Sequence, residues 1–345
     1  MDGEAAGGGV MIRISNVYHM LAYAFRSLNV GGSTQMGKEE FKNLHELFAE
    51  IIMNGMRKQL KRGLPHCYSI KSEELGNLRG KIDLQSTIRG LTMTRRHLVC
   101  AIDDFTEDTP GNRLIKYAIA HLLRQNDVST DRKHYLKFLW SGLNNVTDTG
   151  YIKIPPQRTG GAEYIFLVNI CHFLLDGMLM KTGSGYKMQQ WLKDETMSSL
   201  YEHFLLEYFR RHHACFNARS ARIDWDMPVL PPYMPQMRSD VFLTYGDKKL
   251  IIDAKFYNRT MSEHFGKKIY HSHNLYQIFT YVKNEDKTKD GSVSGMLLYA
   301  KTDEDITPDS DSMIGGNMIS VKTLDLSQNF ASIRSQLDQV ASILV

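Results

Sequence analysis

A hairpin of two apolar strands near the C-terminal end limits the fold of this 345-residue chain more than any other stretch. Residues 238–245 and 248–255 are rich in β-branched and aromatic side chains, and Gly246-Asp247 separates them. This pattern predicts two antiparallel strands joined by a tight turn. A predicted helix precedes the hairpin, and a helix and the strand 293–299 follow it. This order of elements predicts an α/β/α core.

Three charged residues gather where the two strands adjoin. Strand side chains alternate between faces, so Asp253 and Lys255 point the same way, and Asp240 begins the partner strand beside them. Two carboxylates suit Mg²⁺, with the Ala254 carbonyl as a further candidate ligand, and the ammonium can steady a hydroxide or a developing phosphorane charge. This D-x(n)-(D/E)-x-K layout is typical of metal-dependent nucleases.

The alternative interpretation of these charges is a surface ion pair, which stabilises a protein by about 0–1 kcal/mol. Against it, Asp253 follows a strongly apolar strand, where an unpaired charge would cost free energy. The second aspartate, Asp240, also begins the preceding strand. We therefore favour the metal-dependent site.

Other side chains are candidates for the same site. Gln277 and Tyr281 are four residues apart in the predicted helix 274–281, so they share a face and can line one groove. Glu202 borders the apolar face of an earlier helix and is a candidate third metal-site acid, or else an ordinary helix-boundary glutamate. Four residues after Lys255 are candidates for phosphate contacts or for a solvated loop: Tyr257, Arg259, Lys267 and Lys268.

The chain divides into three predicted parts. Residues 1–11 are small and flexible and predict a disordered leader, 12–190 predict a mixed α+β domain, and 191–345 predict the α/β/α domain. Residues 64–104 of the middle part are β-rich and basic, and residues 302–320 are polar and predict a loop. Helices of the N-terminal domain are predicted from Ser15 or Asn16 as the cap to Leu28, and at 38–62, 109–122, 131–143 and 165–180.

One short stretch nearly matches a nucleotide-binding motif. Gly32 to Glu39 follows the phosphate loop G-x-x-x-x-G-K-[ST] except at its last position. Glu39 would repel phosphate there and cannot supply the hydroxyl that binds Mg²⁺. We therefore predict no nucleotide site in this chain, so any nucleotide-driven work belongs to another chain.

Bulk properties restrict the function only weakly. The net charge of +4 permits a nucleic-acid partner without demanding one. The four cysteines lie far apart, which favours reduced thiols over disulfides or zinc ligands. The most apolar run, 166–180, is too short and too polar to cross a bilayer, so we expect no membrane association and a cytoplasmic protein.

The residues of the predicted site resemble a known family. R-S-D-V at 238–241, L-I-I-D-A-K-F-Y at 250–257 and H-N-L-Y-Q-I-F-T-Y at 273–281 are similar to the PD-(D/E)xK nuclease domain of McrC. McrC proteins are the endonuclease subunits of McrBC modified-cytosine restriction systems.

The likeness continues toward the N-terminus. I-S-N-V-Y-H-M-L-A-Y-A-F at 14–25, L-R-G-K-I-D-L-Q-S-T-I-R-G at 78–90 and F-T-E-D-T-P-G-N-R-L-I-K at 105–116 resemble the N-terminal region of the family. The resemblance thus covers about residues 12–340. The nuclease motif alone is common to many enzymes, and the N-terminal segments make the resemblance specific.

The resemblance implies both a site and a partner. Asp240, Asp253 and Lys255 match the family's catalytic triad, with Ser239 in place of the motif's proline, and Gln277 and Tyr281 match a Q-x-x-x-Y helix. The family implies Mg²⁺ at the site and a hexameric McrB-like AAA+ GTPase ring, which binds the GTP and recognises double-stranded DNA with modified cytosine. The N-terminal domain would dock on that ring and stimulate GTP hydrolysis.

Two other functions remain open on the sequence alone. The chain could be a non-cleaving activator or scaffold subunit of a GTPase ring. It could also be a stand-alone RecB-like repair nuclease, although its modest charge argues against a strong DNA grip of its own.

Overall fold

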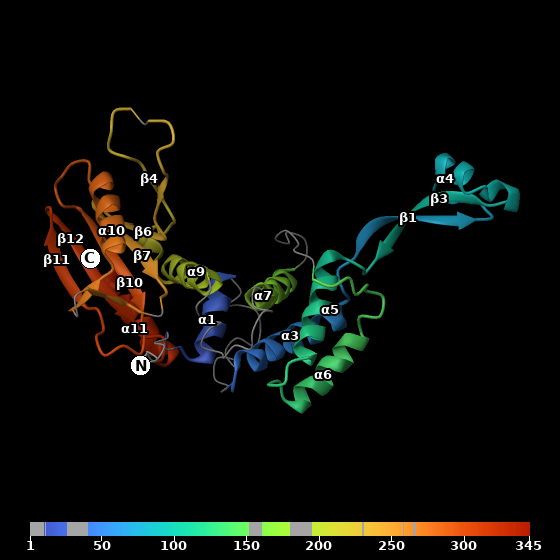
Figure 1. The fold of residues 1–345 in the computed structure, drawn as a ribbon, viewed down its shortest axis with the longest axis horizontal. Helices are drawn as coiled ribbons and strands as arrows, with labels where there is room; N and C mark the ends of the chain where they lie inside the picture. The colour runs from blue at the N-terminus through green and yellow to red at the C-terminus, as the bar shows by residue number, and fades with distance from the viewer. Residues whose placement is uncertain are drawn as a thin grey trace, which may run out of the picture. The chain divides into compact units, whose positions relative to one another are not determined.

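The computed structural model describes residues 10, 12–25, 41–151, 161–179, 195–229, 231–257, 259–264 and 267–345. The chain forms two compact units (Figure 1). The first joins Met1–Leu47 to Asp176–Val345, and the second is Phe48–Leu175.

A five-stranded sheet forms the centre of the first unit, in the order β11-β12-β10-β7-β6. The three central strands are parallel, and the two edge strands run antiparallel to their neighbours. The strands are β6 (Val241–Tyr245), β7 (Lys248–Lys255), β10 (Val293–Ala300), β11 (Ser310–Ile314) and β12 (Asn317–Leu324). The predicted hairpin is thus β6–β7, with Gly246 at positive φ in its turn.

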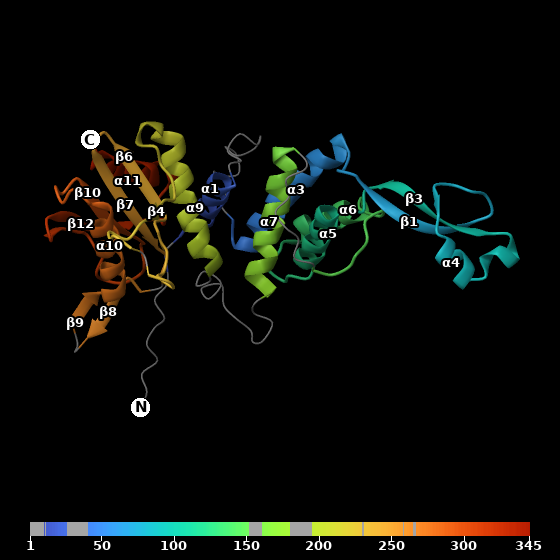
Figure 2. The same ribbon diagram turned by 90° about the horizontal axis from the view of Figure 1, so that it is seen from above.

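Helices cover both faces of this sheet (Figure 2). On one face, α10 (Ser272–Glu285) packs Ile278 and Val282 against Ile251 and Leu297. On the other face lie α9 (Glu195–His212) and α11 (Phe330–Ser342). The predicted α/β/α core is therefore confirmed.

The N-terminal helix α1 (Ile14–Ala24) packs against α9 in the first unit. The predicted caps were wrong, because Arg13 is the N-cap and Ser15 and Asn16 lie inside the helix. Asn16 is buried, and its Nδ2 donates to the carbonyl oxygens of Leu326 at 2.8 Å and Gln328 at 2.7 Å. Its amide therefore joins α1 to the C-terminal part of the chain.

The units differ from the division expected from sequence. That division placed 12–190 in one domain, whereas α1 belongs with the C-terminal sheet. Of the expected disordered leader 1–11, only Val10 is described; it is buried and forms an antiparallel bridge with Thr302. The stretch 32–39, which nearly matches the phosphate loop, lies outside the described residues.

The expectation of a loop over 302–320 was wrong for most of its second half. Residues 310–314 form β11, and β12 begins at Asn317. Gly315 and Gly316, both at positive φ, make the turn between the two strands. The sequence of β11 lacks the alternation of apolar and polar residues that marks a half-buried strand, because β11 is an exposed edge strand with polar residues on both faces.

Short elements complete the first unit. They are η2 (Ala214–Phe216), β4 (Arg222–Ile223), β5 (Met237–Arg238), β8 (Met261–His264) and β9 (Lys267–Tyr270). The β4–β5 pair leads directly into Asp240. The β8–β9 hairpin follows the end of β7, and Glu304 fixes its start by accepting from the Thr260 hydroxyl at 2.7 Å.

The second unit combines helices with a β-sheet arm. The helices are α3 (Leu44–Arg62), α5 (Pro110–Leu123), α6 (Thr130–Ser141) and α7 (Ala162–Leu179). Their core includes Phe48, Ile119 and Leu174. Helix α5 starts as predicted, with Thr109 as N-cap accepting from Asn112 N at 3.1 Å and Pro110 in the first turn. None of the helices in the described ranges is long and apolar enough to span a membrane.

Residues 67–106 make up the arm. It contains β1 (Cys67–Leu75), β2 (Lys81–Ile82), α4 (Leu84–Arg89), η1 (Thr92–Arg95) and β3 (Leu98–Thr106). Figures 1 and 2 show β1 and β3 side by side, and they pair antiparallel over their full length. Most side chains of β1 are exposed, so the arm contributes little to the core of its unit.

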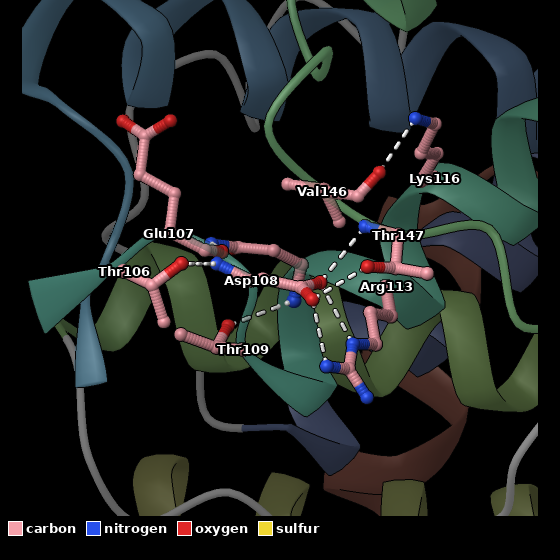
Figure 3. A network of polar contacts seen from close by, with 9 residues as sticks. Thr106, Glu107, Asp108, Thr109, Arg113, Lys116, Val146 and Thr147 are labelled. Carbon is pink, nitrogen blue, oxygen red and sulfur yellow. Dashed lines mark hydrogen bonds and ion pairs between the residues drawn. The ribbon is translucent and has the colours of Figure 1, made fainter. Parts of the chain in front are cut away.

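A polar network closes the root of the arm (Figure 3). Arg113 donates two hydrogen bonds of 2.7 Å to the Asp108 carboxylate, and Thr147 donates to it from its amide at 2.8 Å and its hydroxyl at 2.6 Å. These donors, Arg113 first, hold the pKa of Asp108 well below its usual value. Nearby, the buried Lys116 donates to the Leu143 and Val146 carbonyls. The network ties the end of β3 to α5 and to the segment after α6.

Candidate active site

The two aspartates of the predicted site lie opposite each other across β6 and β7. Val241 pairs with Ile252, so Asp240 and Asp253 occupy the next positions along the hairpin. Asp240 is half-buried, and its Oδ2 accepts from the Ala254 amide at 2.7 Å. Asp253 is buried at 3% exposure. The hairpin therefore brings two carboxylates together at one edge of the sheet.

Lys255 lies on the same face of β7 as Asp253. Its Nζ is 2.7 Å from Asp253 Oδ2, a buried oxygen that has no further hydrogen-bond partner among the described residues. Nζ also donates to Gln277 Oε1 at 3.0 Å, and Gln277 Nε2 donates to the Tyr281 hydroxyl at 2.9 Å. The face of α10 predicted to carry Gln277 and Tyr281 thus orients the lysine.

Burial and the repulsion between neighbouring acids disfavour the ionised forms of Asp240 and Asp253. Burial, Asp253 and Glu202 together raise the pKa of Asp240 from 3.8 to about 8. Burial also raises the pKa of Asp253, although Lys255 opposes the change. Burial lowers the pKa of Lys255, but Asp253 outweighs it and the net direction is upward. One ammonium does not offset the acids, so the site is net negative whenever both aspartates are ionised.

Glu202 lies on α9 and borders the same site. Burial raises its pKa, and Asp253 adds to the rise while Lys255 opposes it. Glu202 and Asp240 both line a groove of about 690 Å³. The other lining residues are Ala24, His203, Leu206, Glu207, Arg210, Ser220, Arg238 and Ser239.

The donor set fits a hard divalent ion that keeps several waters. Within the described residues no group of three or more His, Cys, Asp or Glu side chains is arranged to hold a metal. The site offers two carboxylates instead, one with a buried oxygen left unpaired apart from its ion pair. Mg²⁺ is commonly bound through one or two carboxylates with water completing its shell. The ligand role of the Ala254 carbonyl stays a prediction.

The four candidate phosphate contacts are not alike. Tyr257 is partly buried against the core and lies 3.4 Å from Asn274 Oδ1 through its hydroxyl. Arg259 is exposed, and so are Lys267 and Lys268 on β9. Their exposure fits phosphate contacts and a solvated surface equally, so this stays a prediction.

Sequence reasoning missed the role of two residues at the groove. Arg238 reads as the start of a strand, but its side chain lines the groove and its Nε donates to Ser220 Oγ at 2.9 Å. Ser220 in turn donates to the Ser239 carbonyl at 2.7 Å. The only sequence signal for Arg238 is that a basic residue stands two positions before Asp240. Nothing in the sequence marks Ser220.

The match to known proteins extends over most of the chain. Residues 11–300 match the family described as McrBC 5-methylcytosine restriction system component. The chain belongs to this family. It is 26% identical over 340 residues to the Type IV methyl-directed restriction enzyme EcoKMcrBC of Escherichia coli K12, covering 95% of this chain and 96% of that protein.

A solved structure shares the fold of this McrBC-family chain. It is the refined half-complex from the tetradecameric assembly of Thermococcus gammatolerans McrB AAA+ hexamers with bound McrC. The match has a TM-score of 0.52 at 14% identity and covers 96% of this chain and 76% of that one. At this identity the likeness concerns the fold alone, and it agrees with the α/β architecture described above.

Proposed function

We propose that this restriction-system component is the DNA-cleaving subunit, a Mg²⁺-dependent endodeoxyribonuclease. The observation that supports this most is the pair Asp240 and Asp253, adjacent across β6–β7, with Lys255 Nζ 2.7 Å from Asp253. Such a constellation has little value as a stabilising device, because burying like charges together costs free energy. The two carboxylates are suited to binding a cation, and the lysine to interacting with a phosphodiester.

Each residue has a distinct part in this proposal. Asp240 and Asp253 hold the Mg²⁺, which when bound supplies charge stabilisation at the phosphoryl group and an activated water. Lys255, oriented by Gln277, offsets negative charge developing at the phosphate or orients the attacking water. Tyr281 supports Gln277 from the next turn of α10. Glu202 extends the acidic rim of the groove.

We further propose that the substrate is double-stranded DNA with modified cytosine. The family description names a 5-methylcytosine restriction system, and the curated relative is described as methyl-directed. One such site cuts one strand, so a double-strand break requires two copies of the chain.

The partner in this proposal is a hexameric McrB-like AAA+ GTPase, which binds the GTP. The related structure is a complex of McrB AAA+ hexamers with bound McrC. The arm is the natural contact, because it exposes apolar side chains that its own unit leaves uncovered, and exposed patches of this kind mark interaction sites. They are Tyr68, Ile70, Leu78, Leu84, Ile88, Leu91, Met93 and Phe105. A second function, stimulation of the partner's GTP turnover, follows from this contact.

Cleavage of modified DNA by the purified chain tests the proposal, with the chain alone and with an McrB-like GTPase partner added. We expect cutting only with partner, GTP and Mg²⁺, and none in EDTA. Cutting of plain DNA by the chain alone would favour a stand-alone repair nuclease. Stimulated GTP turnover without cutting under any condition would favour the activator function alone.

A further inference from the structure

The groove beside Asp240 and Glu202 is also lined by two arginines, Arg210 and Arg238, which the proposed chemistry does not use. Arg238 ends β5, and Asp240 follows it two residues later, immediately before β6. Both line the groove of about 690 Å³, with Glu202 beside Asp240. The lining of the groove therefore includes two acids of the candidate site and the guanidinium of Arg238.

The two arginines of the groove differ in how they are paired. Arg210 forms an ion pair with Glu207 and donates from Nε to the Ala218 carbonyl at 3.1 Å. Arg238 donates only from Nε, to the neutral Ser220 hydroxyl at 2.9 Å, and has no carboxylate partner among the described residues. Its charge and its two Nη groups are thus available to an anion.

Ser220 holds Arg238 in place without neutralising it. The Ser220 hydroxyl donates to the Ser239 carbonyl at 2.7 Å and accepts from Arg238 Nε at 2.9 Å. Ser239 is buried and accepts from the Ala221 amide at 3.2 Å. The guanidinium is therefore tethered to the same short segment that positions Asp240.

We propose that Arg238 binds a non-bridging oxygen of the phosphate next to the scissile one, and so sets the register of the DNA strand at the acids. This inference rests on the proposed nuclease function. A guanidinium suits this task because its planar donors match phosphate oxygens. The contact carries no base information, so Arg238 positions the strand and leaves sequence choice to other parts of the complex.

Cleavage of backbone-modified DNA tests the contact in the full chain assembled with its GTPase partner. A single neutral methylphosphonate is placed at each phosphate flanking the mapped cut. At one of these positions we expect wild type to slow about tenfold, as losing a charged hydrogen bond implies. Arg238→Ala slows by a similar factor on normal DNA and shows no further loss at that position, while Arg238→Lys keeps part of the rate.

Arg222→Ala is the matched control, because Arg222 pairs with Arg238 across β4–β5 but does not line the groove. It removes the same charge and should cut like wild type. Equal methylphosphonate penalties in wild type and Arg238→Ala at every flanking position would overturn the inference. So would unchanged cutting by Arg238→Ala.

A second measurement separates this inference from the nuclease proposal. DNA binding by the complex is followed in Mg²⁺ with a non-hydrolysable GTP analogue, which withholds the GTP turnover that cutting requires, at several salt concentrations. Arg238→Ala should lower the slope of log affinity against log salt by about one, the change expected for one lost phosphate contact. If Arg238→Ala lowers the slope but wild type never cleaves DNA, the nuclease proposal is wrong and the phosphate contact is supported. If the slope is unchanged and wild type cleaves DNA, the phosphate contact of Arg238 is wrong and the nuclease proposal is unaffected.

Discussion

Lys255 and Asp253 form an ion pair of 2.7 Å in which the side chains are only 10% and 4% exposed. Removing both charges from water is costly, and the pair persists because Gln277 accepts a further hydrogen bond from the ammonium. Among the described residues Asp240 has no cation in an ion pair with it, and burial and its acidic neighbours raise its pKa. A divalent ion would offset the negative charge that Asp240 gains when it ionises.

The raised pKa of Asp240 predicts a pH dependence in the absence of metal. A carboxyl whose pKa rises from 3.8 to about 8 on folding favours the folded state at low pH and loses that contribution as pH rises toward 8. Each pH unit in this window costs at most about 1.4 kcal/mol. In EDTA, Asp240→Asn should therefore gain stability relative to wild type between pH 5 and pH 8, as thermal unfolding would detect.

Mg²⁺ should reverse the order of stability of wild type and Asp240→Asn. Wild type should gain melting temperature on addition of Mg²⁺ at pH 8, and Asp240→Asn should gain much less, since one ligand is gone. Equal Mg²⁺ stabilisation of both proteins would place the ion elsewhere.

Gln277 should affect cleavage through Lys255. Gln277→Leu removes the acceptor 3.0 Å from Lys255 Nζ and keeps a side chain of similar size. We expect the single-turnover cleavage rate to fall about tenfold, the usual cost of one hydrogen bond to a charged group. Tyr276→Ala, at an exposed position one residue away on α10, is the control and should cut normally. A wild-type rate for Gln277→Leu would mean that Lys255 needs no orientation from α10.

The network at the root of the arm should stabilise the second unit in a pH-dependent way. Arg113→Gln removes the charge that holds the pKa of Asp108 low, and we expect a loss of about 1 kcal/mol at pH 7 after allowing for solvent screening. The contribution is present above the ordinary pKa of aspartate and is lost as pH falls below it. Urea unfolding should thus show a wild-type advantage at pH 7 that shrinks by pH 3. Arg95→Gln, which breaks an exposed pair with Glu74, should change the midpoint little at either pH.

The exposed apolar side chains of the arm should matter for the partner and not for folding. Met93→Glu and Met313→Glu change the same residue type at 63% and 64% exposure, the first on the arm and the second on β11. Neither should shift the melting temperature much, since exposed substitutions usually change stability by about 0.5 kcal/mol or less. Only Met93→Glu should reduce stimulation of the partner's GTP turnover. Equal stimulation by both variants would remove this part of the arm from the contact.

Local sequence pattern predicted the geometry around the β6–β7 hairpin. The β6–β7 hairpin and the positions of Asp253 and Lys255 follow from strand alternation, and the pairing of Gln277 with Tyr281 follows from helical periodicity. These relationships involve residues that are close in sequence or in adjoining strands. They needed no knowledge of the rest of the fold.

Contacts between distant residues could not be predicted in this way. Asn16 resembles a helix cap, and its actual partners are carbonyls more than 300 residues later. Ser220 is 18 residues from Arg238, and only the β4–β5 pairing brings them together. The edge strand β11 lacks the apolar alternation that marks a half-buried strand.

Cleavage of modified DNA by Asp253→Asn, assembled with the GTPase partner in GTP and Mg²⁺, tests the central proposal most directly. The amide keeps the size of the side chain and removes the charge that the ion requires. We predict no detectable DNA product, together with GTP turnover stimulated as strongly as by wild type, because the arm is unchanged. Cutting at the wild-type rate would contradict the assignment of the active site to the β6–β7 hairpin.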